Sequence, residues 1–251
     1  MKTVFPFLVF LFSASLAIAQ QTKIDYGNNP DAGMYYNIRG IRLYCEIYGK
    51  GRPLLMLHGN GGSINAFSKN IPYFSKRYKV MAVDSRAHGK SIDNKDSLSF
   101  EMMADDFAAL LDTLKIDSAY VIGWSDGGIN AIEMAMRHPK KVIRFVSTGA
   151  NVSTDSSAFV PPLWQQGNDF YEAHKYFRPI AQHEKNSWKL FMLDYTQPNI
   201  PWQQLNTIKC PALIMAGDKD LISLEHTIAI YRNIPRAQLW VIPNYSHGTL
   251  Q

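Results

Sequence analysis

The chain has 251 residues and a hydrophobic content of 46%, which is enough for one large α/β domain or two small ones. Its formal net charge of +5 is mild, and the basic residues are spread along the chain, so nothing favours nucleic-acid binding. The two cysteines, Cys45 and Cys210, lie far apart in strand-like segments. A disulfide-stapled scaffold is therefore excluded; one disulfide is conceivable, but two buried free thiols are the prediction.

The first twenty residues have the pattern of a cleaved secretory signal. One lysine precedes an apolar run, Val4–Phe12, and the small residues Ala17–Ala19 follow it. This pattern predicts a signal peptide over residues 1–19, a mature domain over residues 20–251, and a secreted or periplasmic location. A retained membrane anchor is the alternative. No stable membrane insertion is expected, because the apolar run is short for a bilayer span and contains a proline.

Short apolar segments then alternate with longer helical patterns, which predicts an α/β fold with a mostly parallel sheet and helices on both faces. The first two strands are separated by one glycine and alternate in polarity, so we expect an antiparallel hairpin there. Later runs such as 54–57 and 212–216 are continuously apolar, as in strands covered on both faces. Eight strands are predicted in all, at residues 34–39, 41–49, 53–59, 78–85, 119–125, 142–149, 211–217 and 237–244.

Two helices are predicted between these strands. One follows Ser99, a plausible N-cap, and runs to about residue 116; the other begins near Gly127 and is stopped by Pro139. The interval from about 151 to 208 breaks the alternation, since it contains several prolines, many aromatic residues and no convincing strand. Such an insertion is expected to form a helical cap over the sheet edge where ligands bind.

The segment Gly123-Trp124-Ser125-Asp126-Gly127 matches G-x-S-x-G, a pattern that is weak on its own. Its context is more informative, because an apolar strand precedes the serine and an amphipathic helix follows it, as in a nucleophile elbow. The two glycines avoid a collision of side chains across the sharp turn. The helix N-terminus directs N–H groups toward developing negative charge. Ser125 is therefore the candidate nucleophile.

A serine hydroxyl is a poor nucleophile unless a base removes its proton and an acid orients that base. His247, after the last predicted strand, is the candidate base. Asp220 is the candidate acid and Asp218 the alternative, because Asp220 lies further beyond the end of its strand. These residues follow Ser125 in the chain order expected for such a site.

The glycine-rich loop after the strand at 53–59 is expected to supply half of an oxyanion hole. The N–H of Asn60, or of a neighbour, would join the N–H of Asp126 in binding the oxyanion. His58 is interpreted as a hydrogen-bonded structural residue. Asp84 and Arg86 are expected to hold loops together at the same sheet edge.

Several of these segments together resemble the α/β-hydrolase fold family, over essentially the whole chain after the predicted signal: LHGNGGS, DSRAHGKS, GWSDGG, CPALIMAGDKD and YSHG. Within the family, VIGWSDGGINAIEMAMRHPKKV and STGAN look like the valacyclovir hydrolase (biphenyl hydrolase-like) branch, whose members cleave esters of amino acids. Similar bacterial hydrolases are often grouped with enol-lactonases. The resemblance implies a triad of Ser125, Asp220 and His247. It also implies that Asp126, the acid after the nucleophile, receives the α-ammonium group of the substrate.

Two features depart from the family pattern. Members continue beyond the catalytic histidine into a helix that packs on the sheet, whereas four residues follow His247 here. Either the chain is truncated or this sheet edge is unusually bare. The oxyanion loop reads His-Gly-Asn-Gly, which differs from that of the close relative, so the substrate preference of the branch is not carried over.

The leading interpretation is a serine hydrolase that cleaves small carboxylic esters or lactones, aminoacyl esters among them, through an acyl-enzyme intermediate. Trp124 and Trp188 are candidate substrate-binding residues. The substrate is expected to be a small ester, lactone or amide. An aminopeptidase of the same fold and a non-catalytic small-ligand-binding protein are the alternatives. Neither a metal site nor a cofactor is expected, because the histidines are scattered and no nucleotide-binding motif occurs.

Overall fold

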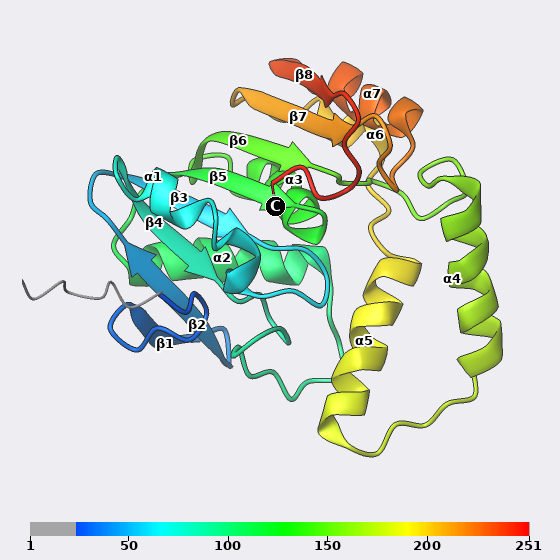
Figure 1. Cartoon of the computed structure of the whole chain (residues 1–251), viewed down its shortest axis with the longest axis horizontal. Coiled ribbons are helices and arrows are strands. Elements are labelled where there is room, and N and C mark those ends of the chain that lie inside the picture. The colour runs from blue at the N-terminus through cyan, green and yellow to red at the C-terminus, as the bar shows by residue number, and fades with distance from the viewer. Residues whose placement is uncertain (1–23, 251) are drawn as a thin grey trace, which may run out of the picture.

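A central eight-stranded sheet organises the computed structural model, which describes residues 24–250 (Figure 1). The predicted signal peptide lies outside the described residues. The strand order is β1-β2-β4-β3-β5-β6-β7-β8; β2 runs antiparallel to both neighbours, and the other pairs are parallel. The predicted sheet and its N-terminal hairpin are confirmed. The strands are β1 (Gly33–Ile38), β2 (Ile41–Tyr48), β3 (Arg52–Leu57), β4 (Tyr78–Val83), β5 (Ala119–Trp124), β6 (Val142–Thr148), β7 (Ala212–Gly217) and β8 (Ala237–Ile242).

Apolar side chains cover both faces of the sheet. Along β3, Leu55 and Leu57 join a core formed with α2 (Phe100–Thr113), α3 (Asp126–Arg137) and α7 (Leu224–Asn233). Leu54 and Met56 point to the opposite face, toward the 3-10 helix η1 (Ile64–Phe67) and the short helix α1 (Ile71–Phe74). Successive side chains of a strand point to opposite faces, so a continuous apolar run follows from burial on both sides.

The start of α2 agrees with the sequence-based expectation. Ser99 is extended, with φ −148°, and its side-chain oxygen accepts a hydrogen bond from the N–H of Met102 at 3.1 Å. This bond satisfies one of the backbone donors that a helix leaves free at its first turn. The helix then places Met103, Phe107 and Leu111 in the core.

The segment between β6 and β7 is helical in the structure, with α4 (Pro161–His174), α5 (Gln182–Thr196) and α6 (Trp202–Leu205). The helices α4 and α5 stand beside the carboxyl ends of the parallel strands (Figure 1). We call α4 and α5 the cap helices. None of the residues of α4 is buried, and α5 buries Leu193 alone. Stacked aromatic rings join the two helices, with Tyr171 and Tyr195 at a centroid separation of 4.5 Å.

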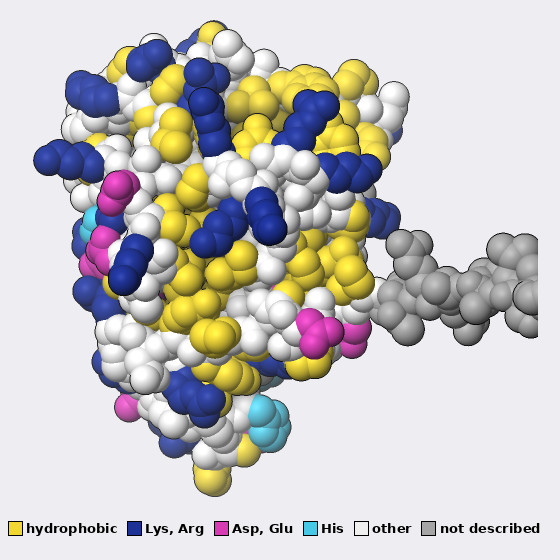
Figure 2. Space-filling view, turned by 90° about the vertical axis from the view of Figure 1, so that its left-hand side faces the viewer, with side chains coloured by type: hydrophobic (Ala, Val, Ile, Leu, Met, Phe, Trp, Pro, Cys, Tyr) yellow, Lys and Arg dark blue, Asp and Glu magenta, His cyan; other side chains and the backbone are white. Residues whose placement is uncertain are grey.

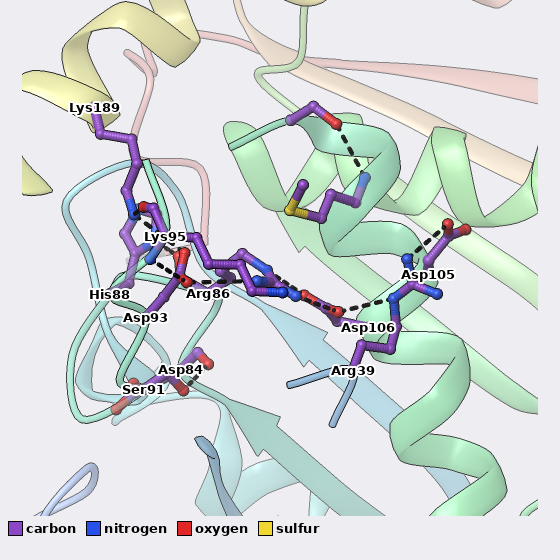
Figure 3. Close-up of polar contacts among 12 residues, drawn as sticks. Arg39, Asp84, Arg86, His88, Ser91, Asp93, Lys95, Asp105, Asp106 and Lys189 are labelled. Carbon is purple, nitrogen blue, oxygen red and sulfur yellow. Dashed lines mark hydrogen bonds and ion pairs between the residues drawn. The ribbon is translucent and has the colours of Figure 1, made fainter. Parts of the chain in front are cut away.

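A buried series of charges connects the cap to the body of the protein (Figure 3). Arg86 donates to Asp106 of α2 from Nε at 2.7 Å and from Nη2 at 2.8 Å, and it lies 3.5 Å from Asp93. Lys189 of α5 donates to the other side of Asp93 at 3.1 Å. Asp84 accepts from the backbone of η1 and from the N–H of Lys90. The predicted loop-holding roles of Arg86 and Asp84 are thus borne out by their contacts.

The two cysteines are free thiols, as predicted, although Cys45 is buried and Cys210 only partly so. Within residues 24–250, no helix combines the length and apolar character that a membrane span requires. On the side of the sheet opposite α2, an open groove of about 350 Å³ is lined by Tyr120, Val146 and Leu213 with Arg144 and Arg236. Figure 2 shows the side of the molecule at the amino ends of the parallel strands, where hydrophobic side chains are exposed among lysines and arginines.

Candidate active site

The turn between β5 and α3 holds Ser125 in a strained conformation. Its φ is +57° and its ψ −121°, an arrangement that non-glycine residues rarely adopt. A Cβ at Gly123 would collide with the carbonyl oxygen of Gly127, and one at Gly127 would collide with that of Leu57. The glycines therefore let β5, α3 and the end of β3 meet at the serine, as a nucleophile elbow requires.

The structure places three of the predicted site residues in one hydrogen-bonded series. Nε2 of His247 lies 3.0 Å from Oγ of Ser125, and Nδ1 of His247 lies 2.6 Å from Oδ1 of Asp220. With hydrogen on Nδ1, the imidazole donates to the carboxylate and accepts from the hydroxyl. Asp220 is buried, whereas Asp218, the alternative acid, has an exposed side chain. The geometry thus distinguishes Asp220 from Asp218.

The loop that carries His247 is held against the elbow by two contacts. The indole N–H of Trp124 donates to the carbonyl oxygen of His247 at 2.8 Å, and the hydroxyls of Thr148 and Thr249 lie 2.5 Å apart. Trp124, a candidate for substrate binding in the sequence, thus uses its polar atom to hold the histidine loop. Gly149 has φ +62°, and a Cβ there would lie 2.8 Å from Cε1 of His247. The imidazole therefore sits directly against the backbone that follows β6.

Two backbone N–H groups close to Ser125 in the fold have no backbone acceptor among the described residues. Asp126 is the first residue of α3, so its N–H has no acceptor within the helix. Asn60 lies in the loop after β3, and its N–H makes no backbone hydrogen bond among the described residues. This loop approaches the nucleophile closely, because a Cβ at Gly59 would lie 2.9 Å from that of Ser125. The arrangement suits an oxyanion hole in which both N–H groups donate.

His58, at the start of the same loop, is buried and has two backbone partners. Its Nε2 accepts from the N–H of Ser85 at 3.0 Å, and its Nδ1 lies 2.7 Å from the carbonyl oxygen of Gly59. Burial lowers the pKa of His58 to about 3, and the neighbouring His88 adds to this effect. A lowered pKa and hydrogen-bonding partners at both ring nitrogens support the interpretation that His58 is structural.

A second acid, which the sequence did not single out, lies beside the nucleophile. Asp194 of α5 lies close enough to Asp126 for its charge to act on it, and the side chain of Asn60 lowers the pKa of both carboxyls. Burial, and then the charge of Asp194, raises the pKa of Asp126 well above its usual range. The surrounding protein also raises the pKa of Asp194, although its side chain opens onto the cap cavity. The Asn60 amide donates to the carbonyl oxygen of Leu190 at 3.1 Å, which attaches the oxyanion loop to α5.

A cavity of about 530 Å³ lies between α4, α5 and the loop after β6, with Asp194 in its wall. We call it the cap cavity; much of its lining is aromatic, and the aromatic residues are Phe159, Trp164, Phe191 and Tyr195. Trp188, a predicted substrate-binding residue, does not line it. Its ring packs against Phe177 and Phe191 and borders a separate surface pocket beside Lys95–Leu98. Within residues 24–250, no three His, Cys, Asp or Glu side chains are grouped so as to hold a metal ion.

The elbow, the sheet order and the cap define a hydrolase of the α/β type, and comparison with known proteins agrees. Residues 52–186 match the alpha/beta hydrolase fold family. The chain is 31% identical to the 2-hydroxymuconate semialdehyde hydrolase of Pseudomonas sp. (strain CF600), over 88% of this chain and 89% of that protein. The chain therefore belongs to the alpha/beta hydrolase fold family.

Two further similarities bear on the branch and the fold. Serine hydrolase BPHL of Homo sapiens is 27% identical, over 84% of this chain and 78% of that protein, which agrees with the predicted resemblance to the biphenyl hydrolase-like branch. A solved N-acyl homoserine lactone degrading enzyme is 23% identical and has a TM-score of 0.72, with 86% of this chain and 93% of that chain covered. At this identity, the second similarity shows the shared fold alone.

Proposed function

We propose that the protein is a serine esterase that cleaves small carboxylic esters or lactones and prefers acyl groups that carry an amine. The observation that carries the proposal is the hydrogen-bonded series Asp220–His247–Ser125, with separations of 2.6 and 3.0 Å, at the base of the cap. A positioned base beside a strained, partly buried serine is the arrangement that activates a hydroxyl for acyl transfer.

The reaction follows from this geometry. Nε2 of His247 accepts the hydroxyl proton as Oγ of Ser125 attacks the substrate carbonyl, and Asp220 stabilises the imidazolium. The N–H groups of Asn60 and Asp126 donate to the oxyanion; the loss of one such donor typically costs about 3 kcal/mol. His247 then passes the proton to the departing alcohol oxygen. Water, deprotonated by the same nitrogen, releases the acid and restores the hydroxyl.

The acids beside the nucleophile support the preference for an amine. Asp126 is next to Ser125 and has 5% of its surface exposed, so its carboxyl is shielded from bulk water. A carboxylate group on the substrate would meet Asp126 and Asp194, which is unfavourable. The Pseudomonas relative is named for a muconate, which is such an anion. An ammonium group is attracted by the same acids, so aminoacyl esters fit better.

Covalent labelling tests the nucleophile directly. A fluorophosphonate probe is expected to label the wild-type protein and to leave Ser125→Ala unlabelled. Absence of wild-type labelling, or equal labelling of both proteins, would refute the proposed mechanism. An aminoacyl ester and the matching anilide, assayed side by side, distinguish an esterase from an aminopeptidase, since both activities need an acid near the amine.

Export is proposed on the N-terminal pattern of residues 1–19 alone. N-terminal sequencing of the protein recovered from a secreting host is expected to begin at Gln20. Recovery of the uncleaved chain in the cell interior would contradict this proposal.

A further inference from the structure

Two carboxyls from different layers of the fold lie near each other beside the nucleophile. Asp126 begins α3, directly after Ser125, and Asp194 lies near the end of α5. Asp194 is one helical turn after Leu190, whose carbonyl oxygen accepts from the Asn60 side chain at 3.1 Å, and the charge of Asp194 acts on Asp126. Oδ2 of Asp126 is buried and has no hydrogen-bond donor among the described residues. A buried carboxylate oxygen without a donor is costly, so this position requires a partner.

A proton shared between the two acids would satisfy that oxygen. Two carboxylates this close cannot both ionise without strong repulsion, so the pair retains one proton at a pH where isolated aspartates have lost theirs. An ammonium group offers three N–H donors together with a positive charge, and it can occupy the same place with both acids ionised.

We propose that Asp194 completes an ammonium-binding site with Asp126, and that the amine of the substrate replaces the proton shared by the two acids. The inference rests on the proposed function and adds a second, specificity-determining residue to it. On binding, R–NH₃⁺ forms hydrogen bonds to both carboxylates, and the shared proton leaves to solvent. No covalent bond changes in this step.

The lining of the cap cavity supports a cationic guest. None of the described residues that line it is a lysine or arginine. Phe191 and Tyr195, on either side of Asp194 in α5, present aromatic rings to the same cavity. Aromatic faces attract cations and also accommodate the apolar remainder of an acyl group.

The groups that face the pair determine the direction of the pH effect. Asp126 faces Asp194, the Asn60 amide and its own backbone N–H; Asp194 faces Asp126, the Asn60 amide and the imidazole of His247. Asp155, another acid, also lines the cavity. Desolvation by the surrounding protein raises the pKa of Asp194 to about 6, although the residue is exposed to the cap cavity. Because the ammonium must displace a proton, selectivity for the amine is expected to rise with pH. The rise should end at about pH 7, where α-amino groups begin to lose their own charge.

The kinetic experiment compares phenylalanine ethyl ester with 3-phenylpropanoate ethyl ester, which differ only by the α-amino group. Asp194→Asn is expected to lower kcat/KM for the amino ester by about 10- to 100-fold, the loss of one charge-assisted hydrogen bond, and to change the other ester by less than about 3-fold. Asp169→Asn is the matched control, because it removes an exposed acid of α4 that contacts Gln165. It should leave the ratio unchanged.

Wild-type selectivity for the amino ester should rise between pH 5 and 7, and this rise should be weaker in Asp194→Asn, where burial of Asp126 alone remains. Equal losses on both esters, or an unaltered pH profile, would show that Asp194 only supports the local structure and would overturn the proposal. If the wild type cleaves neither ester, the proposed function fails instead.

A binding measurement is independent of turnover. Calorimetry of Ser125→Ala with phenylalanine ethyl ester, in two buffers with different heats of ionisation, reports the protons released on binding. We expect release at pH 5.5 from Ser125→Ala and a smaller release when Asp194→Asn is added, because burial still raises the pKa of Asp126. Equal release from both proteins, or binding without proton release in both, would overturn the proposal.

Discussion

Replacing Gly149 with alanine tests how closely the backbone after β6 controls His247. The new Cβ would lie 2.8 Å from Cε1 and 2.9 Å from Nδ1 of the imidazole, whereas ordinary contacts begin at 3.4 Å. The ring would have to move by about half an ångström to relieve this contact. Both of its hydrogen bonds, to Ser125 and to Asp220, depend on its position.

The substitution should affect both the stability of the fold and the rate of the reaction, and the size of each effect can be stated separately. Gly149 has φ +62°, and placing an L side chain in this left-handed region costs about 1–2 kcal/mol of folding free energy. Displacing a catalytic group by up to 1 Å can reduce the rate by about 100-fold. We therefore expect Gly149→Ala to lower kcat/KM for a neutral ester by 10- to 100-fold.

Gly40→Ala is the matched control. Gly40 has φ +82° in the β1–β2 turn, and its nearest neighbour would be the flexible end of Lys95 at 3.4 Å. Urea unfolding should show a loss of similar size in both variants, and ester assays should show loss of activity in Gly149→Ala alone. Full activity in Gly149→Ala, with the stability loss present, would refute the argument that this backbone positions the histidine.

Three further predictions concern stability and the histidine loop. Burial, together with the charge of Glu101, raises the pKa of Glu133 to about 7. The folded protein therefore binds the Glu133 proton more tightly than the unfolded chain does. Its stability should fall as the pH rises from about 4.5 to 7. At pH 8, the free energy of unfolding of Glu133→Gln, measured with urea, should therefore exceed that of the wild type by up to about 3 kcal/mol. At pH 4 the two proteins should differ little. Arg86→Met removes the buried cation between Asp93 and Asp106, leaving Asp93 with Lys189 and Asp106 with Arg39, and should cost about 3–5 kcal/mol in urea unfolding. A loss below about 1 kcal/mol would contradict the proposed importance of the charge series. Trp124→Phe removes the donor to the His247 carbonyl and should lower kcat more than it raises KM, whereas a pure KM effect would favour direct substrate contact.

The sheet and the nucleophile turn were predictable because their signals are local. Strands buried on both faces must be continuously apolar, and a serine between two glycines at a strand-to-helix junction has few structural alternatives. His247 and Asp220 could be identified because the carboxyl ends of parallel strands meet at one sheet edge.

The cap was the part of the chain that sequence patterns described least well. Which side chains of α5 reach the nucleophile depends on how that helix is seated, and no periodicity in the chain specifies this seating. Asp194 was missed for this reason. Trp188 lies six residues earlier, almost two helical turns further from the site, and aromatic character alone could not locate it. A signal was present in the aromatic pair that flanks Asp194, Phe191 and Tyr195.

The two cap helices differ in how firmly they are attached to the body of the protein, and this difference indicates where the cap can be substituted. Side-chain hydrogen bonds attach α5 to the body, from Lys189 to Asp93 and to the carbonyl oxygen of Lys95, and from the Asn60 amide to the carbonyl oxygen of Leu190. None of the residues of α4 is buried, and α4 meets α5 through aromatic stacking. A rearrangement that preserved the α5 contacts would be confined to α4. Substitutions meant to change the size of the accepted acyl group should therefore be made on the cavity face of α4, where they leave the contacts that position the triad unchanged.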